Sequence, residues 1–171
     1  MKHTLLAILA ALACVAVATA QPPMAIGVTI PASTPLSCGA QQVILKKMQQ
    51  LTTLNGVGAQ AENTRFRLTP SVRIVSSDVT PTAPPSQLVK LSIVLMIADT
   101  AGSKSIVAQT ELSAKGTGKN EEAAVLNALQ QVDIRSAALK RFMEQGKKRI
   151  ADMPPVGHQP PAAADTATGE N

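Results

Sequence analysis

Residues 88–98, LVKLSIVLMIA, decide the fold, because their side chains alternate with the two-residue period of a β-strand. One face of this strand is wholly apolar and comprises Val89, Leu91, Ile93, Leu95 and Ile97. The opposite face mixes Lys90 and Ser92 with Val94 and Met96. A strand of this kind predicts a sheet with one face packed on a core and the other face open.

The segment before this strand repeats the alternation. In residues 65–76, one face carries Phe66, Leu68, Val72 and Ile74, and the other carries Arg65, Arg67, Thr69, Ser71 and Arg73. Because Pro70 cannot donate to a hydrogen-bond ladder, this strand is expected to lie at a sheet edge or to carry a bulge there. Residues 77–87 are expected to form a loop.

The segment after the central strand predicts a hairpin. Residues 99–104 contain Gly102 and read as the turn, and residues 106–114 return with alternating apolar positions. The register that brings the two apolar faces together pairs Ile97 with Ile106, Leu95 with Ala108, and Leu91 with Leu112.

Helical spacing accounts for the rest of the domain. Ile26, Val28 and Ile30 predict a short strand, after which Thr34-Pro35 starts a helix that Asn55-Gly56 ends. Asn120 caps a second helix and Ser136 begins a third, with the cations Lys147, Lys148 and Arg149 at its end. The order predicts an α+β fold, in which an antiparallel sheet of three to four strands has helices packed on one face as a two-layer sandwich.

The ends of the chain indicate export. Residues 1–20 are typical of a signal peptide, with Ala18 and Ala20 before the cleavage site and Gln21 as the new N-terminus. Residues 21–25 follow as a tether, residues 26–152 form the single domain, and residues 153–171 form a disordered tail. The alternative is a lipoprotein anchored through Cys14, although the apolar sequence after that cysteine fits cleavage at Ala20 better. A periplasmic or outer-membrane-associated location is expected, and an extracellular one remains open.

Composition excludes several kinds of site. The only histidines are His3 in the leader and His158 in the tail, so the domain offers neither a histidine-based nucleophile nor a typical zinc site. We therefore expect no catalytic residues, no metal and no cofactor. The absence of Trp and Tyr removes the aromatic platform of single-strand nucleic-acid binding, so no nucleic-acid partner is expected.

Two smaller features favour structural roles. Cys38 is expected to be a small buried apolar residue inside a helix, and no second cysteine of the mature chain could pair with it. The segment Gly116-Thr117-Gly118-Lys119 lacks the spacing of a phosphate-binding loop and is expected to be a turn.

The candidate binding surface is basic. Arg65, Arg67 and Arg73, with Lys90 on the next strand, predict a basic stripe on a half-apolar sheet face beside an edge strand. We expect a protein of the envelope to dock there. The alternative is an anionic polymer or membrane surface bound by these arginines with residues 147–149. A third hypothesis, a carboxylate-based hydrolase, has as candidates Asp78, Asp99, Glu111, Glu121 and Glu122.

Two segments carry a family resemblance. Residues 63–70, continuing to 78–85, and residues 115–124 with Asn127-Ala128-Leu129 resemble small secreted or lipoprotein domains of unknown function common in Bacteroidetes. The unit of strand, Gly-x-Gly and Ala-rich helix is more distantly similar to periplasmic accessory domains of the curli-secretion and TolB N-terminal type. The resemblance implies an α/β envelope domain that binds other proteins, with no catalytic residues to transfer.

Overall fold

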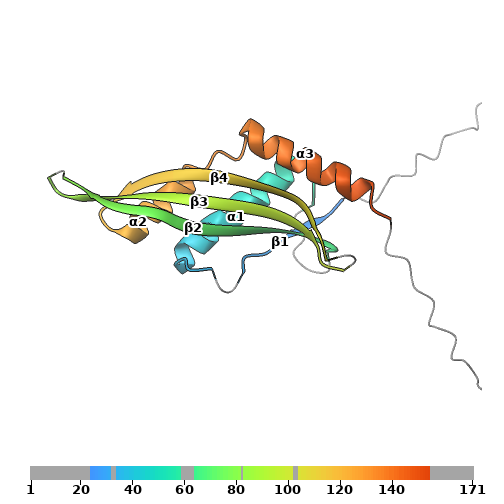
Figure 1. The fold of residues 1–171 in the computed structure, drawn as a ribbon, viewed down its shortest axis with the longest axis horizontal. Helices are drawn as coiled ribbons and strands as arrows, with labels where there is room; N and C mark the ends of the chain where they lie inside the picture. The colour runs from blue at the N-terminus through green and yellow to red at the C-terminus, as the bar shows by residue number, and fades with distance from the viewer. Residues whose placement is uncertain (1–23, 32–33, 59–63, 82, 102–103, 155–171) are drawn as a thin grey trace, which may run out of the picture.

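The computed structural model describes residues 24–31, 34–58, 64–81, 83–101 and 104–154. The predicted signal peptide, its cleavage site and most of the predicted tail lie outside the described residues. Four strands form one sheet in the order β1 (Ile26–Val28), β2 (Phe66–Thr80), β3 (Ser86–Asp99) and β4 (Ile106–Gly118) (Figure 1). The last three are antiparallel, whereas β1 is parallel to β2.

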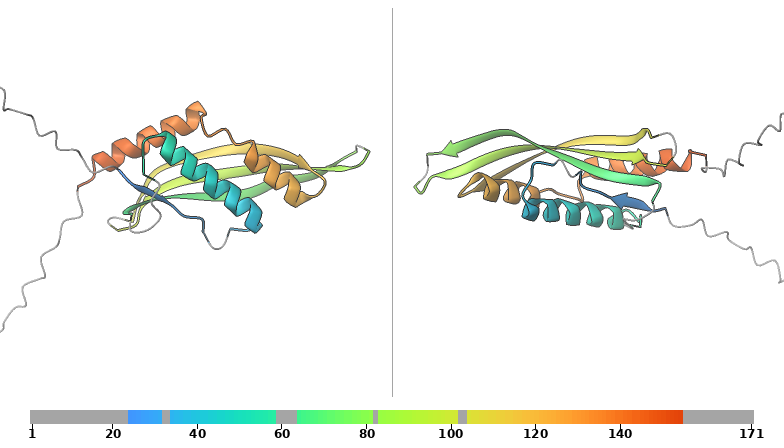
Figure 2. Two further views of the ribbon diagram at one scale, coloured as in Figure 1. Left: turned by 180° about the vertical axis from the view of Figure 1, so that it is seen from behind. Right: turned by 90° about the horizontal axis from the view of Figure 1, so that it is seen from below.

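The helices are α1 (Cys38–Leu54), α2 (Glu121–Gln130) and α3 (Ala137–Ala151). Figure 2 shows all three on one face of the sheet, with the other face bare. The α+β class and the one-sided helix layer are therefore confirmed. The expectation that every strand is antiparallel is wrong for β1, because α1 crosses over between β1 and β2 and returns the chain in the same direction.

The core lies between the sheet and the helices. All five apolar residues predicted for the inner face of β3 are fully buried. They pack with side chains of the three helices, among them Ile44, Met48, Leu129, Leu139 and Phe142. Burying a large aliphatic side chain stabilises the fold by about 2 kcal/mol, so this layer supplies most of the driving force for folding.

The predicted register between β3 and β4 is wrong by two residues. Ile97 pairs with Ala108, Leu95 with Thr110 and Leu91 with Ala114, and a bulge separates Ala108 from Ile106. Because side chains alternate along a strand, a shift of two residues leaves most side chains of β4 on the face predicted for them. The bulge changes the rest: Val107 is buried, while Ile106 is 55% exposed instead of facing the core.

The β2–β3 hairpin is longer than expected. β2 runs on to Thr80 and β3 begins at Ser86, so most of the predicted loop 77–87 is strand. A bulge between Ile74 and Ser76 shifts the register halfway along. Figure 2 shows the tip of this hairpin reaching beyond α1 and α2. The tip of the hairpin therefore has no helix beneath it, whereas Ser77 still contacts Glu121 at the start of α2.

Of the two situations predicted for Pro70, a sheet edge or a bulge, the structure shows the edge. β1 pairs only with residues Phe66–Leu68 of β2, and the Leu68 carbonyl accepts the last bond from the Thr29 amide. Backbone groups of alternate residues point to the same side of a strand, so position 70 also faces the β1 side. Pro70 has no N–H to donate, and at this position no strand of the described chain lies beside β2 to accept a hydrogen bond.

Gly116 and Gly118 belong to β4 and do not form the predicted turn. A Cβ on Gly116 would lie 2.2 Å from the Ala124 carbonyl oxygen, and one on Gly118 would lie 2.4 Å from the Ala124 nitrogen. The glycines therefore let α2 pack directly against the backbone of β4. This close contact is a structural reason for the Gly-x-Gly sequence and involves no phosphate.

The start of α1 also differs from expectation. The helix begins at Cys38 with Ser37 as its N-cap, since the Ala40 amide donates to the Ser37 hydroxyl, rather than at Thr34-Pro35. Cys38 is exposed in the first turn, so the expectation of a buried cysteine is wrong. At the other end, Asn55 caps the helix and Gly56 adopts a φ of +69°, as predicted.

Candidate docking surface

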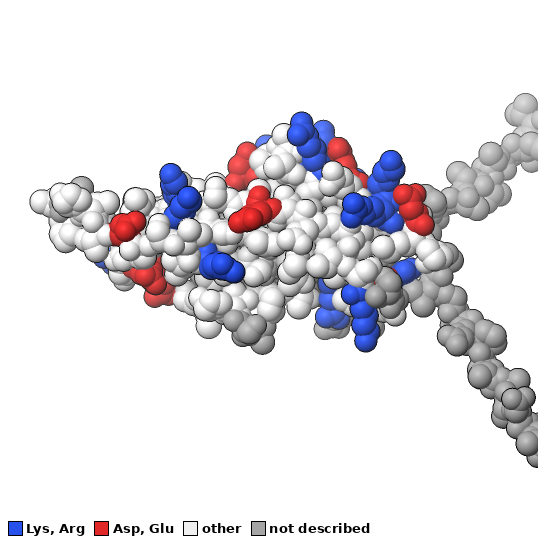
Figure 3. All heavy atoms as spheres, viewed as in Figure 1, with Lys and Arg blue, Asp and Glu red and all other residues white. Residues whose placement is uncertain are grey.

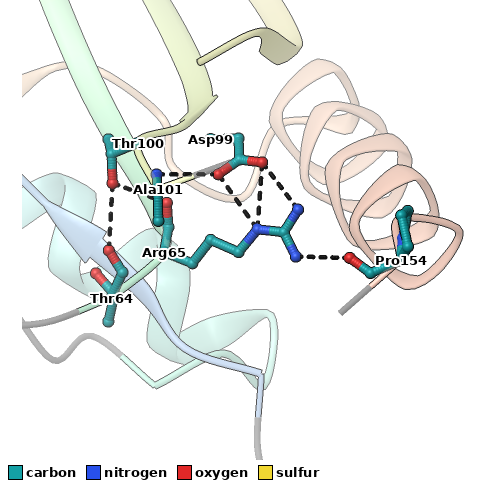
Figure 4. Close-up of polar contacts among 6 residues, drawn as sticks. All are labelled: Thr64, Arg65, Asp99, Thr100, Ala101 and Pro154. Atoms are coloured by element: carbon teal, nitrogen blue, oxygen red, sulfur yellow. Dashed lines mark hydrogen bonds and ion pairs between the residues drawn. The ribbon is translucent and has the colours of Figure 1, made fainter. Parts of the chain in front are cut away.

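Arg65 does not belong to the predicted basic stripe. Its guanidinium forms an ion pair with Asp99, with Nη2 2.9 Å from Oδ2, and also donates to the Pro154 carbonyl at 2.9 Å (Figure 4). The Asp99 side chain is 0% exposed and that of Arg65 is 23% exposed. Arg65 therefore joins the start of β2, the end of β3 and the chain after α3, and is not available for a partner.

Arg67, Arg73 and Lys90 do lie on the open face of the sheet. Arg67 pairs with Ala98, Arg73 with Ser92, and Lys90 with Lys115 of β4. The six residues that separate the two arginines correspond to about 20 Å along the strand. Figure 3 shows charged side chains scattered over this face, with uncharged surface between them. Three of the four residues predicted for the basic stripe therefore lie on the predicted face, but spaced apart and without Arg65.

Acidic side chains also interrupt the positive charge. Glu111 lies on β4 opposite Val94 and accepts a hydrogen bond from the Ser92 hydroxyl at 2.6 Å. Asp78 lies on the distal half of β2 opposite Leu88. Sequence reasoning missed Lys115, which the β3–β4 register places directly beside Lys90.

The open face is half apolar along β3, as predicted from Val94 and Met96, but Val107 is buried and does not belong to it. Val94 and Met96 are half-buried on β3, with Ala98 beyond them and Ile106 exposed beside Ala98 on β4. In the described part of the chain no helix covers these residues. The apolar residues thus follow β3, between Thr69 and Ser71 of β2 on one side and Gln109 and Glu111 of β4 on the other.

The cations near the end of α3 are committed within the molecule. The Lys147 ammonium donates to the Asn55 carbonyl at 3.0 Å, and the Arg149 guanidinium donates to the Val107 carbonyl at 2.7 Å. Lys147 thereby caps the C-terminal end of α1, where a positive charge is favourable. The hypothesis of binding to an anionic surface relied on Arg65, Lys147 and Arg149 among its cations. All three side chains are engaged in contacts within the protein.

Most of the candidate carboxylates have contacts or structural roles of their own. Among the described residues, no group of three or more His, Cys, Asp or Glu side chains is placed to hold a metal ion. Of the five candidate acids, Asp99 is paired with Arg65, Glu111 bonds to Ser92, and Glu121 accepts from the Ser77 hydroxyl. Glu121 and Glu122 occupy the first turn of α2, where negative charge is favourable.

Grooves on the helix side offer little polar chemistry. One of about 430 Å³ is lined by residues of α1 and by Ile134 and Arg135, and its polar side chains are all exposed. Another, of about 460 Å³, runs between β1 and α1 past Cys38 and is largely apolar. Within the described chain, no helix is long and apolar enough to cross a membrane.

The distal half of β2 is a surface that sequence reasoning missed. Five large apolar side chains are exposed in the described part of the chain, and three of them lie here: Ile74 at 37%, Val75 at 54% and Val79 at 67%. A signal was present in the sequence, because the alternation of residues 65–74 slips by one position at Val75. This slip marks the bulge and shows that the strand continues beyond it.

Comparisons with known proteins give the following similarities. No family model matches the chain, and no curated protein matches it. Among solved structures, a minor lipoprotein from Acinetobacter baumannii is 13% identical with a TM-score of 0.45, covering 72% of this chain and 93% of that one. A presumed lipoprotein from Caulobacter crescentus has the same identity and TM-score, covering 76% and 93% of the two chains. A DUF330 protein from Xanthomonas campestris is 15% identical with a TM-score of 0.39, covering 77% and 87%.

Two of these proteins are lipoproteins by name. All three TM-scores lie below 0.5, so the similarities carry no argument about what this chain binds. The links to Bacteroidetes domains and to the curli-secretion and TolB types stay predictions.

Proposed function

We propose that this protein is an exported, non-enzymatic binding module that docks a partner protein of the cell envelope on the open face of its sheet. The observation that carries the proposal is the face itself: three long strands leave one side without helices, and Val94 and Met96 form an apolar strip along its middle strand. The export signal at residues 1–20 supports an envelope location.

The chemistry of the face indicates the kind of partner. Val94 and Met96 offer apolar contact area, and Arg73, Lys90 and Lys115 lie beyond them toward the hairpin tip. An apolar centre with a polar, charged rim is the usual arrangement of a protein–protein interface. The matching partner surface is apolar with acidic residues at one side.

An anionic polymer or membrane surface is the weaker alternative. Such binding needs many cations on one surface, yet Arg65, Lys147 and Arg149 are engaged in internal contacts. Those that remain on the open face share it with Glu111 and Asp78. Binding to a polyanion would weaken steeply with salt, whereas docking through the apolar strip would not.

Site-specific photocrosslinking in the native cell tests the proposal. A crosslinking residue at Met96 is expected to yield one dominant protein adduct, whereas the same residue at Gln50, exposed on α1, is not. Met96→Glu should abolish an adduct formed from position 94, and Gln50→Glu should leave it unchanged. Equal adducts from both positions, or insensitivity to Met96→Glu, would overturn the proposal.

A further inference from the structure

The outer edge of β2 changes character beyond Pro70. The Leu68 carbonyl points to the outer side of β2, where it accepts a hydrogen bond from the Thr29 amide. Alternate residues of a strand point their backbone groups to the same side, so the N–H and C=O groups of Val72 and Ile74 also point outward. The bulge inserts one residue and so shifts the alternation by one position. Beyond the bulge, the backbone N–H and C=O groups of Ser77 and Val79 therefore point outward. In the described chain, no strand lies along these groups.

The other edge of the sheet is protected by comparison. β4 carries Glu111 and Lys115 on its exposed face, and the guanidinium of Arg149 occupies the Val107 carbonyl. Charged side chains and blocked backbone groups are common means of preventing a sheet edge from pairing. The distal edge of β2 instead has three exposed apolar residues, at positions 74, 75 and 79.

The bulge indicates what kind of strand fits this edge. The outward-pointing residues are Val72, Ile74, Ser77 and Val79, separated by two, three and two positions. A regular strand presents its bonding groups every two residues and would lose register across the bulge. The spacing reads the same in both directions, so an antiparallel copy of the same strand matches it throughout.

We infer that two copies of this protein pair through their distal β2 edges about a twofold axis between Val75 and Ser76. In this register Val72 lies opposite Val79 of the second copy and Ile74 lies opposite Ser77. Arg73 lies opposite Asp78, in a pair whose backbone groups point inward and whose side chains approach closely. An interface of this kind uses the same patch on both subunits.

The charges of the edge support this register. Arg73 and Asp78 are both exposed, both lie on the open face, and neither side chain makes an ion pair within the described chain. The twofold axis creates two Arg73–Asp78 contacts, and opposite charges in cross-strand pairs are stabilising. The resulting sheet would be continuous, with the open faces of both copies on the same side.

Charge reversal with rescue tests the inference on the mature chain, with Cys38→Ser to prevent adventitious disulfides. Sedimentation equilibrium is expected to show a dimer for the parent, and Asp78→Arg or Arg73→Asp is expected to raise its dissociation constant by about tenfold or more. The double variant Arg73→Asp with Asp78→Arg is expected to restore it. A monomeric parent, or a double variant no better than the single ones, would overturn the inference.

Cysteine crosslinking tests the register independently. In the same background, Arg73→Cys with Asp78→Cys is expected to form an intersubunit disulfide on mild oxidation, and the off-register pair Ser71→Cys with Asp78→Cys is not. Equal crosslinking of both pairs would reject the stated register. Position 96 is remote from this edge, so loss of the dimer and loss of the partner adduct are separate outcomes.

Discussion

The two halves of β2 differ although they belong to one strand. Residues Phe66–Leu68 pair with a strand on each side, and the ion pair of Arg65 with Asp99 lies at their end. Residues beyond Ile74 pair only with β3 and are exposed. We therefore expect substitutions in the proximal half to destabilise the fold more than substitutions in the distal half.

Removing the buried carboxylate is expected to give the largest difference from its control variant. Asp99→Ala leaves the Arg65 guanidinium without its partner, and loss of one member of a buried pair is strongly destabilising, here about 3 kcal/mol. Urea denaturation measures the change in the free energy of unfolding. Glu111→Ala, which removes one exposed hydrogen bond, is the control and should change it by about 0.5 kcal/mol or less. Equal effects would show that the ion pair does not stabilise the proximal half.

Truncation of the same strand at two points should give an intermediate contrast. Leu68 is fully buried and Ile74 is 37% exposed, and both project toward the helix side of β2. Leu68→Ala is expected to cost about 3 kcal/mol, as for other buried leucines, and Ile74→Ala about 1 kcal/mol or less. The measurement uses protein concentrations at which the parent is monomeric. A similar cost at both positions would mean that the distal half also belongs to the folding core.

Alternation in the sequence predicted the fold class, the meander and the inner face of β3, because the two-residue period survives any error of register. The register between β3 and β4 was predicted wrongly, because strict alternation does not allow for the residue that a bulge inserts. The adjacent apolar pairs Ile74-Val75 and Ile106-Val107 mark both bulges in retrospect. The parallel direction of β1 was not predicted, although the strand–helix–strand order is compatible with a crossover connection.

The site was predicted less well than the fold. Alternation assigned Arg65 to the polar face, but its partner Asp99 comes 34 positions later and reads as a turn residue in sequence. The contacts of Lys147 and Arg149 span 92 and 42 positions, which no local pattern reveals. Arg67, Arg73 and Lys90 were placed correctly on the open face, because this placement depends only on the strand period.

Amide hydrogen exchange should show the smallest energetic effect and the finest detail. In the monomer, the outward amides of Ile74, Ser77 and Val79 belong to exposed residues and are expected to exchange fast, whereas Val72 is only 5% exposed and should exchange more slowly. The inward amides of Arg73 and Asp78, bonded to β3, should be protected.

Raising the protein concentration sharpens this contrast between the halves of β2. If the distal edges pair, protection should appear at the four outward amides and follow their spacing of two, three and two positions. Asp78→Arg should remove that protection and leave the inward amides unchanged. A uniform slowing along β2 would indicate a general rigidification of the strand. Protection confined to the four outward positions can only come from new backbone bonds on that side, which is the feature that separates strand pairing from contact through side chains alone.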